Sequence, residues 1–215
     1  MLPDPKDKIE EQNLLHAALT AVEGEEPNKA RAALEKLLLM DEKPATALAQ
    51  LGHLEFSAGN YKEAAEYFRR ARKFRPDDAG IALDYARALK MNHDANGARN
   101  VLQASLRANP HQFAARLLLG QIYFRLGDAD AATDQLESAA LLQPENVEAR
   151  TSLAKVLLTQ KKFADAVELL EPLAQSSPNE ADVFALLAQA YAGVGRREDA
   201  RRAQSQAQTL RRRKK

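Results

Sequence analysis

The 215-residue sequence contains no cysteine and no tryptophan. Without cysteine the chain forms neither disulfide bonds nor thiolate metal sites, and this absence is compatible with the cytosol, the periplasm or export. Long apolar stretches are also missing, because the longest uninterrupted one covers only residues 183–188. A transmembrane helix needs roughly 20 such residues, so the sequence predicts no membrane span.

Residues typical of β-strands are scarce. Valine, isoleucine and threonine together number 16, whereas alanine (41) and leucine (31) make up a third of the chain. Alanine and leucine favour helices and β-branched residues favour strands, so the composition predicts an all-α protein. The net charge is only +1, which gives no global attraction to nucleic acid or to an anionic membrane.

Single residue types recur every 34 positions along the chain. Proline does so at Pro76, Pro110, Pro144 and Pro178, and alanine at Ala30, Ala64, Ala98, Ala132, Ala166 and Ala200. A period of this length is typical of a solenoid built from helix–turn–helix units. We therefore expect a single solenoid domain over 1–215, with a lead-in at 1–10 and repeats at 11–44, 45–78, 79–112, 113–146, 147–180 and 181–215.

The second repeat shows how such a unit is encoded. Apolar residues at helical spacing mark two helices, and Gly59 separates them because glycine tolerates the left-handed conformation that ends a helix. Gly52 and Ala64 are small enough for the two helix backbones to approach closely, with Phe68 filling the space beside them. The third repeat departs from this pattern, because residues 91–94 contain no glycine.

Residues of several repeats resemble the motif of the tetratricopeptide repeat family. The matching positions are Leu51, Gly52, Gly59, Tyr61, Ala64, Phe68, Ala71 and Pro76, and again Leu119, Gly120, Tyr123, Gly127, Ala132, Ala139 and Pro144. The resemblance implies an α–α superhelix of six repeats. It also implies a concave groove, lined by the first helix of each repeat, that binds a peptide or a partner helix.

Positions of the first helices that helix packing does not use are the candidate groove residues. They are His53, Phe56, Leu83, Arg87, Lys90, Leu117, Gln121, Phe124, Arg125, Lys155, Leu158 and Gln189. Basic residues in the middle with apolar residues beside them favour a protein segment that carries acidic groups and one or two apolar anchors. The alternative is a solvated inner surface whose basic side chains extend into water.

No catalytic constellation is recognisable. The four histidines fall at different repeat positions, and neither a glycine-rich phosphate loop nor a metal-binding histidine pair occurs. Asp128, Asp130 and Asp134 straddle a turn and a helix start, where capping explains them. We expect no enzyme activity, no cofactor and no bound metal.

The ends of the chain leave three alternatives open. Nine of the last 20 residues are basic, which permits polyanion binding, but no aromatic residue lies among them to stack on bases. We expect a monomer, and the alternative is weak head-to-tail self-association of the acidic first repeat with the basic last repeat. Residues 2–9 are weakly similar to the segment that joins bacterial sulfatase-like domains to C-terminal repeats, which makes an accessory module of a larger bacterial protein the alternative to a separate scaffold. We expect a cytoplasmic location if the chain is complete, and a periplasmic or exported one if it is such a module.

Overall fold

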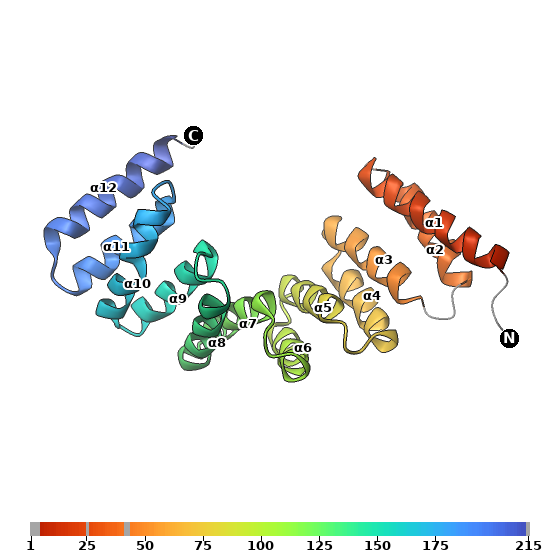
Figure 1. Ribbon diagram of the computed structural model, residues 1–215, viewed down its shortest axis with the longest axis horizontal. Coiled ribbons are helices and arrows are strands. Elements are labelled where there is room, and N and C mark those ends of the chain that lie inside the picture. The colour runs from red at the N-terminus through yellow and green to blue at the C-terminus, as the bar shows by residue number, and fades with distance from the viewer. Residues whose placement is uncertain (1–4, 25, 41–43, 214–215) are drawn as a thin grey trace. The chain divides into compact units, whose positions relative to one another are not determined.

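The computed structural model describes residues 5–24, 26–40 and 44–213. In this part the chain forms α-helices joined by short turns, and no strand occurs (Figure 1). The helices are α1 (Pro5–Glu23), α2 (Pro27–Met40), α3 (Ala45–Ser57), α4 (Tyr61–Phe74), α5 (Ala79–Met91), α6 (Ala95–Ala108), α7 (Phe113–Arg125), α8 (Ala129–Leu142), α9 (Val147–Thr159), α10 (Phe163–Ser176), α11 (Ala181–Gly193) and α12 (Arg197–Arg213). The predicted all-α repeat fold is confirmed. Helix α1 begins within the stretch expected as a lead-in, because Pro5 suits a first helical position.

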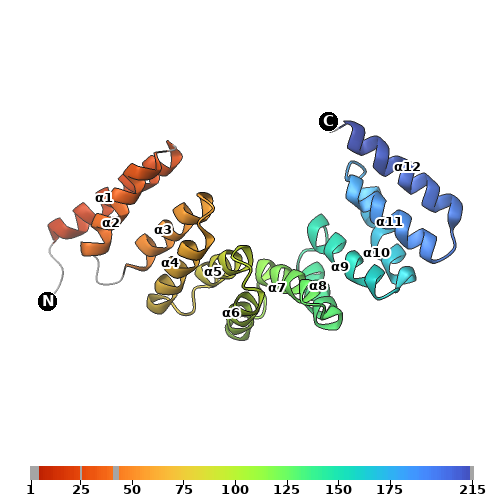
Figure 2. The same ribbon diagram turned by 180° about the vertical axis from the view of Figure 1, so that it is seen from behind.

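The chain divides into two compact units, residues 1–110 and 111–215. In the first unit α1, α3 and α5 pair with α2, α4 and α6. In the second, α7, α9 and α11 pair with α8, α10 and α12, and both α9 and α11 also pack on the pair before them (Figures 1 and 2). A single domain over the whole chain stays a prediction.

Small residues set the distance between the two helices of a repeat. A Cβ atom added at Gly52 of α3 would lie 2.8 Å from the ring of Phe68 in α4, and one added at Gly120 would lie 2.5 Å from Leu136. Phe68 and Leu136 are fully buried. The close approach of the two helices expected at Gly52 is therefore present, and Gly120 allows the same close approach in the second unit.

One turn position has the same backbone conformation in five repeats. Gly59, Gly127 and Gly195 have φ angles between 81° and 83°, and His93 and Lys161 have φ angles of 63° and 60° at the equivalent positions. This explains how the third repeat turns without a glycine: His93 takes the left-handed conformation itself. The packing of the repeat thus imposes a left-handed backbone at this position even where the residue disfavours that conformation.

A buried carboxylate ties the first repeat to the second. Glu55 of α3 is 4% exposed and is bonded by Arg31 of α2 and, at 2.8 Å, by the Asn60 amide. Burial raises the pKa of Glu55, but the hydrogen bonds from Asn60 and Arg31 outweigh burial, so the pKa lies below its usual value. Glu55 therefore stays ionised inside this interface.

Candidate functional site

The candidate groove residues of the first unit lie on α3 and α5. His53 and Arg87 are exposed, and Asp84 lies between them: its carboxylate is 3.4 Å from His53 Nε2 and 3.3 Å from an Arg87 guanidinium nitrogen. Asp84 lies three residues before Arg87 on one helix, a spacing that places both on the same face. The basic charge expected at Arg87 is therefore partly neutralised within the protein.

An acidic residue also faces the candidate groove of the second unit. Gln121 of α7 donates hydrogen bonds to Glu148 of α9 at 2.9 Å and to Ser152 at 3.5 Å. Lys155 of α9 and Gln189 of α11 are exposed. In each unit a polar candidate residue thus contacts an acidic side chain on the first helix of the next repeat.

The sequence analysis missed Asp84 and Glu148. A weak signal was available for Asp84, since a carboxylate three residues before an arginine is a recognisable helical pair. Glu148 gave no such signal, because its partner Gln121 belongs to another helix and only packing brings the two together.

The apolar candidates are all partly or wholly buried. Phe56, Leu83, Phe124 and Leu158 are half-buried, and the ring of Phe56 stands edge-on to Tyr61 with the centroids 5.2 Å apart. Leu117 is only 7% exposed and belongs to the hydrophobic core of the second unit. Leu117 therefore contributes little to an exposed surface. Lys90 is half-buried and Arg125 exposed.

Each unit has a cavity beside a candidate groove residue. In the first, a cavity of about 190 Å³ is lined by α1, the start of α2, and α3, and His53 and Ser57 contribute to it. In the second, a cavity of about 490 Å³ between α11 and α12 includes Gln189 and Ala192, with Ala188 and Ala200 in its lining.

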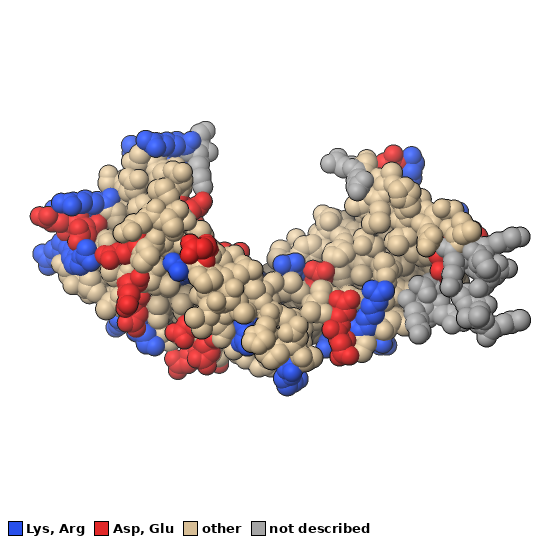
Figure 3. Space-filling view, in the orientation of Figure 1, with Lys and Arg blue, Asp and Glu red and all other residues tan. Residues whose placement is uncertain are grey.

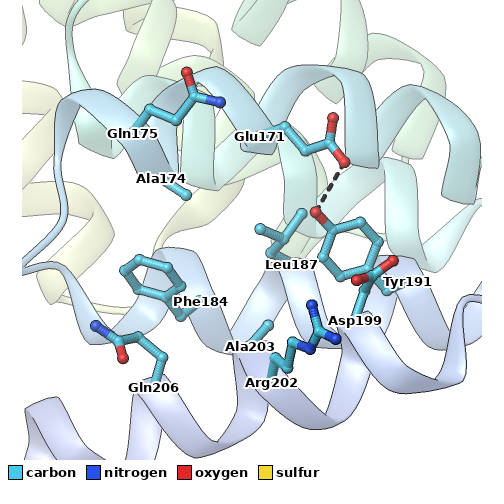
Figure 4. Close-up of a pocket in the computed structure, with 10 residues that line it drawn as sticks. All are labelled: Glu171, Ala174, Gln175, Phe184, Leu187, Tyr191, Asp199, Arg202, Ala203 and Gln206. Atoms are coloured by element: carbon cyan, nitrogen blue, oxygen red, sulfur yellow. Dashed lines mark hydrogen bonds between the residues drawn. The ribbon is translucent and has the colours of Figure 1, made fainter.

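A larger cavity lies away from these positions, at the C-terminal end of the second unit. It measures about 550 Å³ and is lined by α10, α11 and α12 (Figure 4). Tyr191 donates a hydrogen bond to Glu171 at 2.8 Å at one side of it. Burial, and then the bond to Glu171, raise the pKa of Tyr191 to about 12. Tyr191 and then Arg196 hold the pKa of Glu171 below its usual value.

Several basic side chains near the C-terminus have acidic partners. Arg196 bonds Glu171 and Asp199, each at 2.8 Å, and Arg211 bonds Asp182 at 3.0 Å. Figure 3 shows acidic and basic side chains interleaved over this end. Lys214 and Lys215 lie outside the described residues, as do Glu25, Asp41 and Glu42 of the acidic first repeat. Polyanion binding and self-association stay predictions.

The described residues offer no obvious inorganic site. Within 5–24, 26–40 and 44–213, no three histidine, aspartate or glutamate side chains are grouped so as to hold a metal ion. Asp128 accepts a hydrogen bond from the backbone N–H of Ala131 and so caps α8, while Asp130 accepts one from Gln160. In the same part of the chain, no helix has the length and apolarity needed to cross a bilayer.

Three family models match the chain. The model described as Cytochrome c-type biogenesis protein H TPR domain matches residues 101–213, and two described as Tetratricopeptide repeat match residues 55–104 and 15–79.

Two curated relatives illustrate the range of proteins that contain similar repeats. The chain is 28% identical over 159 residues to Protein O-mannosyl-transferase Tmtc3 of Drosophila melanogaster, a match that covers 73% of this chain and 17% of that protein. It is 30% identical over 93 residues to the Putative cytochrome c-type biogenesis protein CcmH of Haemophilus influenzae, covering 42% and 20%. The chain spans between 13% and 22% of the length of the first curated relatives it matches.

Solved structures share the fold at low sequence identity. A tetratricopeptide repeat protein from Parabacteroides merdae superposes with a TM-score of 0.80 at 17% identity, covering 94% of this chain and 80% of that one. YrrB, described as a TPR protein with an unusual peptide-binding site, gives a TM-score of 0.71 at 19% identity, covering 83% and 92%. At these identities the likeness concerns the fold alone.

Proposed function

The chain belongs to the tetratricopeptide repeat family described as Cytochrome c-type biogenesis protein H TPR domain, and on this premise we propose that it is a non-catalytic scaffold that binds a protein segment along its first helices. Proteins with this fold typically serve in protein–protein interaction. The observation that carries the proposal is the row of exposed polar side chains on these helices. His53 and Arg87 represent it in the first unit, and Lys155 and Gln189 in the second.

The physical support comes from what these side chains leave accessible. Each unit combines exposed hydrogen-bonding groups with half-buried apolar side chains and a cavity beside them. Exposed polar groups can bond an extended backbone, while a cavity can take an apolar anchor, which carries most of the affinity in many interfaces. The preference for acidic segments rests on Arg87, Arg125 and Lys155.

Charge reversal at one site in each unit tests the proposal. Binding of an acidic peptide with an apolar anchor is measured by calorimetry for Arg87→Glu and for Lys155→Glu. We expect each variant to lose about tenfold or more in affinity, because an attraction becomes a repulsion. Lys62→Glu on α4 and Arg197→Glu on α12 are matched controls on exposed sites of second helices. Affinity equal to that of the unchanged chain in both groove variants would sink the proposal.

The acidic residue beside Arg87 provides an opposite test. Since Asp84 contacts both His53 and Arg87, Asp84→Asn removes a charge that competes with an acidic peptide. We expect a several-fold gain in affinity for acidic peptides and no gain for a neutral peptide with the same anchor. Equal changes for both peptides would contradict the proposed preference for acidic groups.

A second candidate function concerns the process in which the partner takes part. The match of residues 101–213 to the cytochrome c-type biogenesis family favours a partner from cytochrome c biogenesis. Residues 101–213 would replace the corresponding repeats of the Haemophilus influenzae relative, and assembled cytochrome c would be measured in cells that lack that relative. Restored assembly is expected; a stable, expressed chimaera that restores none would count against this candidate.

The remaining sequence-based alternatives have less support. No relative named above supports the sulfatase-like resemblance. The paired arginines near the C-terminus weaken the argument for polyanion binding, because part of their charge is already balanced. Retention on heparin that disappears when residues 211–215 are deleted is the observation that would favour it.

A further inference from the structure

A small cavity between α4 and α5 of the first unit has mainly basic walls. It measures about 300 Å³ and is lined by Arg69, Arg72, Lys73, Pro76 and Tyr85. The three basic residues belong to α4, and the tyrosine belongs to α5. None of the candidate groove residues lines this cavity, so it is separate from the first-helix surface proposed above.

The polar residues of this cavity stand where other repeats have different chemistry. Tyr85 occupies the repeat position of four buried leucines, Leu51, Leu119, Leu153 and Leu187. Arg72 occupies the position of aliphatic residues, Leu38, Leu106, Ala140 and Ala174. The position of Arg69 is acidic in three other repeats, at Glu35, Glu137 and Glu171. Since aliphatic residues suffice for packing elsewhere, packing alone does not require a phenol and a guanidinium here.

The polar groups of Arg72, Lys73 and Tyr85 have no partner within the protein. Arg72 Nε is buried, and no acceptor bonds it among the residues that the structure describes. In the same part of the chain, Arg72 and Lys73 form no ion pair and the Tyr85 hydroxyl forms no hydrogen bond. Burial raises the pKa of Tyr85, so its hydroxyl stays protonated and can donate. A buried donor without an acceptor costs free energy, which a ligand oxygen on the guanidinium would offset.

The charge at the cavity is positive once the nearby carboxylates are included. Two carboxylates act on the tyrosine of the cavity, those of Glu66 and Asp94. Glu66 accepts two hydrogen bonds from Arg69, at 2.7 and 2.8 Å, and Asp94 caps the start of α6. Arg72 and Lys73 therefore keep a positive charge that no carboxylate bonds.

A phosphate ester matches these groups better than a carboxylate does. A phosphoryl group carries a charge of about −1.5 to −2 and three acceptor oxygens, whereas a carboxylate carries a single charge and two oxygens. The cavity offers the guanidinium of Arg72, the ammonium of Lys73 and the hydroxyl of Tyr85. The planar guanidinium can bond two phosphoryl oxygens at once. The ring of Tyr85 and Pro76 form an apolar wall for the carbon beside the ester oxygen.

We propose that the cavity between α4 and α5 is an oxyanion site that binds the phosphoryl group of a phosphate monoester through Arg72, Lys73 and Tyr85. This group occurs in small phosphate esters and on phosphorylated side chains of polypeptides, and separate probes distinguish the two sources. The site is independent of the first-helix groove, so failure of the groove proposal leaves it unaffected.

Calorimetric titration of the full chain at low salt tests the site. A capped pentapeptide with a central phosphoserine and glycerol phosphate represent the two sources, and the tighter binder of the two identifies the source. The same peptide with glutamate in place of phosphoserine, and inorganic phosphate, are the comparison anions. We expect saturable binding of a phosphate ester, at least tenfold tighter than binding of the glutamate peptide.

Three variants locate the binding. Arg72→Leu introduces the residue that two other repeats have at this position, so we expect a folded chain with at least tenfold weaker binding of the ester. Tyr85→Leu introduces the residue of four other repeats and should weaken binding several-fold. Arg70→Leu is the matched control, because it removes the same charge from an exposed site on α4 that faces the ring of Tyr67 instead. Its affinity should stay within twofold of that of the unchanged chain.

Each contrary outcome removes a defined part of the proposal. Absence of saturable binding at millimolar ester, or unchanged binding in folded Arg72→Leu and Tyr85→Leu variants, overturns the site. Equal losses in Arg70→Leu and Arg72→Leu overturn it in favour of a general attraction to the basic helix. A glutamate peptide that binds as tightly as the phosphoserine peptide overturns the preference for phosphoryl groups. Inorganic phosphate that binds as tightly as both esters overturns the role of the apolar wall.

Discussion

At the scale of the residue, two positions have a backbone conformation that residues with a Cβ atom disfavour. His93 and Lys161 are the non-glycine residues with positive φ in the described part of the chain. A left-handed backbone costs a residue with a Cβ atom about 1–2 kcal/mol. The repeats tolerate this cost because the two helices on either side of each turn pack against each other and hold its geometry.

We predict that His93→Gly and Lys161→Gly each raise the free energy of unfolding by about 0.5–1 kcal/mol, because glycine relieves the strain but loses more chain entropy on folding. The control is Asn92→Gly, at a neighbouring residue with an ordinary φ of −80°, which should lower it. Chemical denaturation monitored by circular dichroism measures all three. A loss of stability in both left-handed variants would contradict the prediction.

The Glu171–Tyr191 pair predicts the pH dependence of the second unit. Because the pKa of Glu171 is lowered in the fold, its contribution to stability is present above the ordinary glutamate pKa and is lost as pH falls through the folded value. Because the pKa of Tyr191 is raised to about 12, its contribution is complete below pH ~10 and is lost as pH rises toward 12. An absorbance titration should therefore contain a late tyrosine transition that Tyr191→Phe removes; a high-pH part of the curve that is the same in Tyr191→Phe would contradict the expected shift.

At the scale of the element, contact between helices decides which residues are allowed. We predict that Gly52→Ala lowers the free energy of unfolding by about 1–3 kcal/mol, since the added methyl group would meet the buried ring of Phe68. Repeats three and five combine alanine with leucine, as Ala86 with Leu102 and Ala154 with Leu170. The double variant Gly52→Ala/Phe68→Leu should therefore be more stable than the sum of the two single changes indicates. Strictly additive losses in denaturation would argue against this close contact.

At the scale of the whole molecule, each of the two units contains hydrophobic core clusters of its own. In the second unit the core includes Leu136, Val156 and Leu170, and in the first Leu34 and Leu51. In repeat proteins each repeat mainly contacts its neighbours, so part of an array often folds alone. We predict that residues 111–215 unfold cooperatively on heating when produced alone. A fragment without a thermal transition would contradict this.

How much could be read from the sequence differs between fold and site. The period, the all-α class and the close contact at Gly52 were predictable, because each depends on residue types at fixed spacing within one repeat. The acidic partners of His53 and Gln121 were not, because Asp84 and Glu148 lie on the next helix pair, and a list of first-helix positions contains no information about side-chain direction across repeats. The burial of Leu117 escaped prediction for the same reason.

The sequence by itself determined that the chain forms paired helices every 34 residues, since helix propensity, turn residues and small contact residues act locally and repeat in phase. Only the tertiary structure decided how a chain without cysteine and without long apolar runs is stabilised. Within each unit, stability comes from the packing of one helix pair on the next. The cavity near the C-terminal end of the second unit could not be predicted from any single repeat, because its walls come from three helices, α10, α11 and α12.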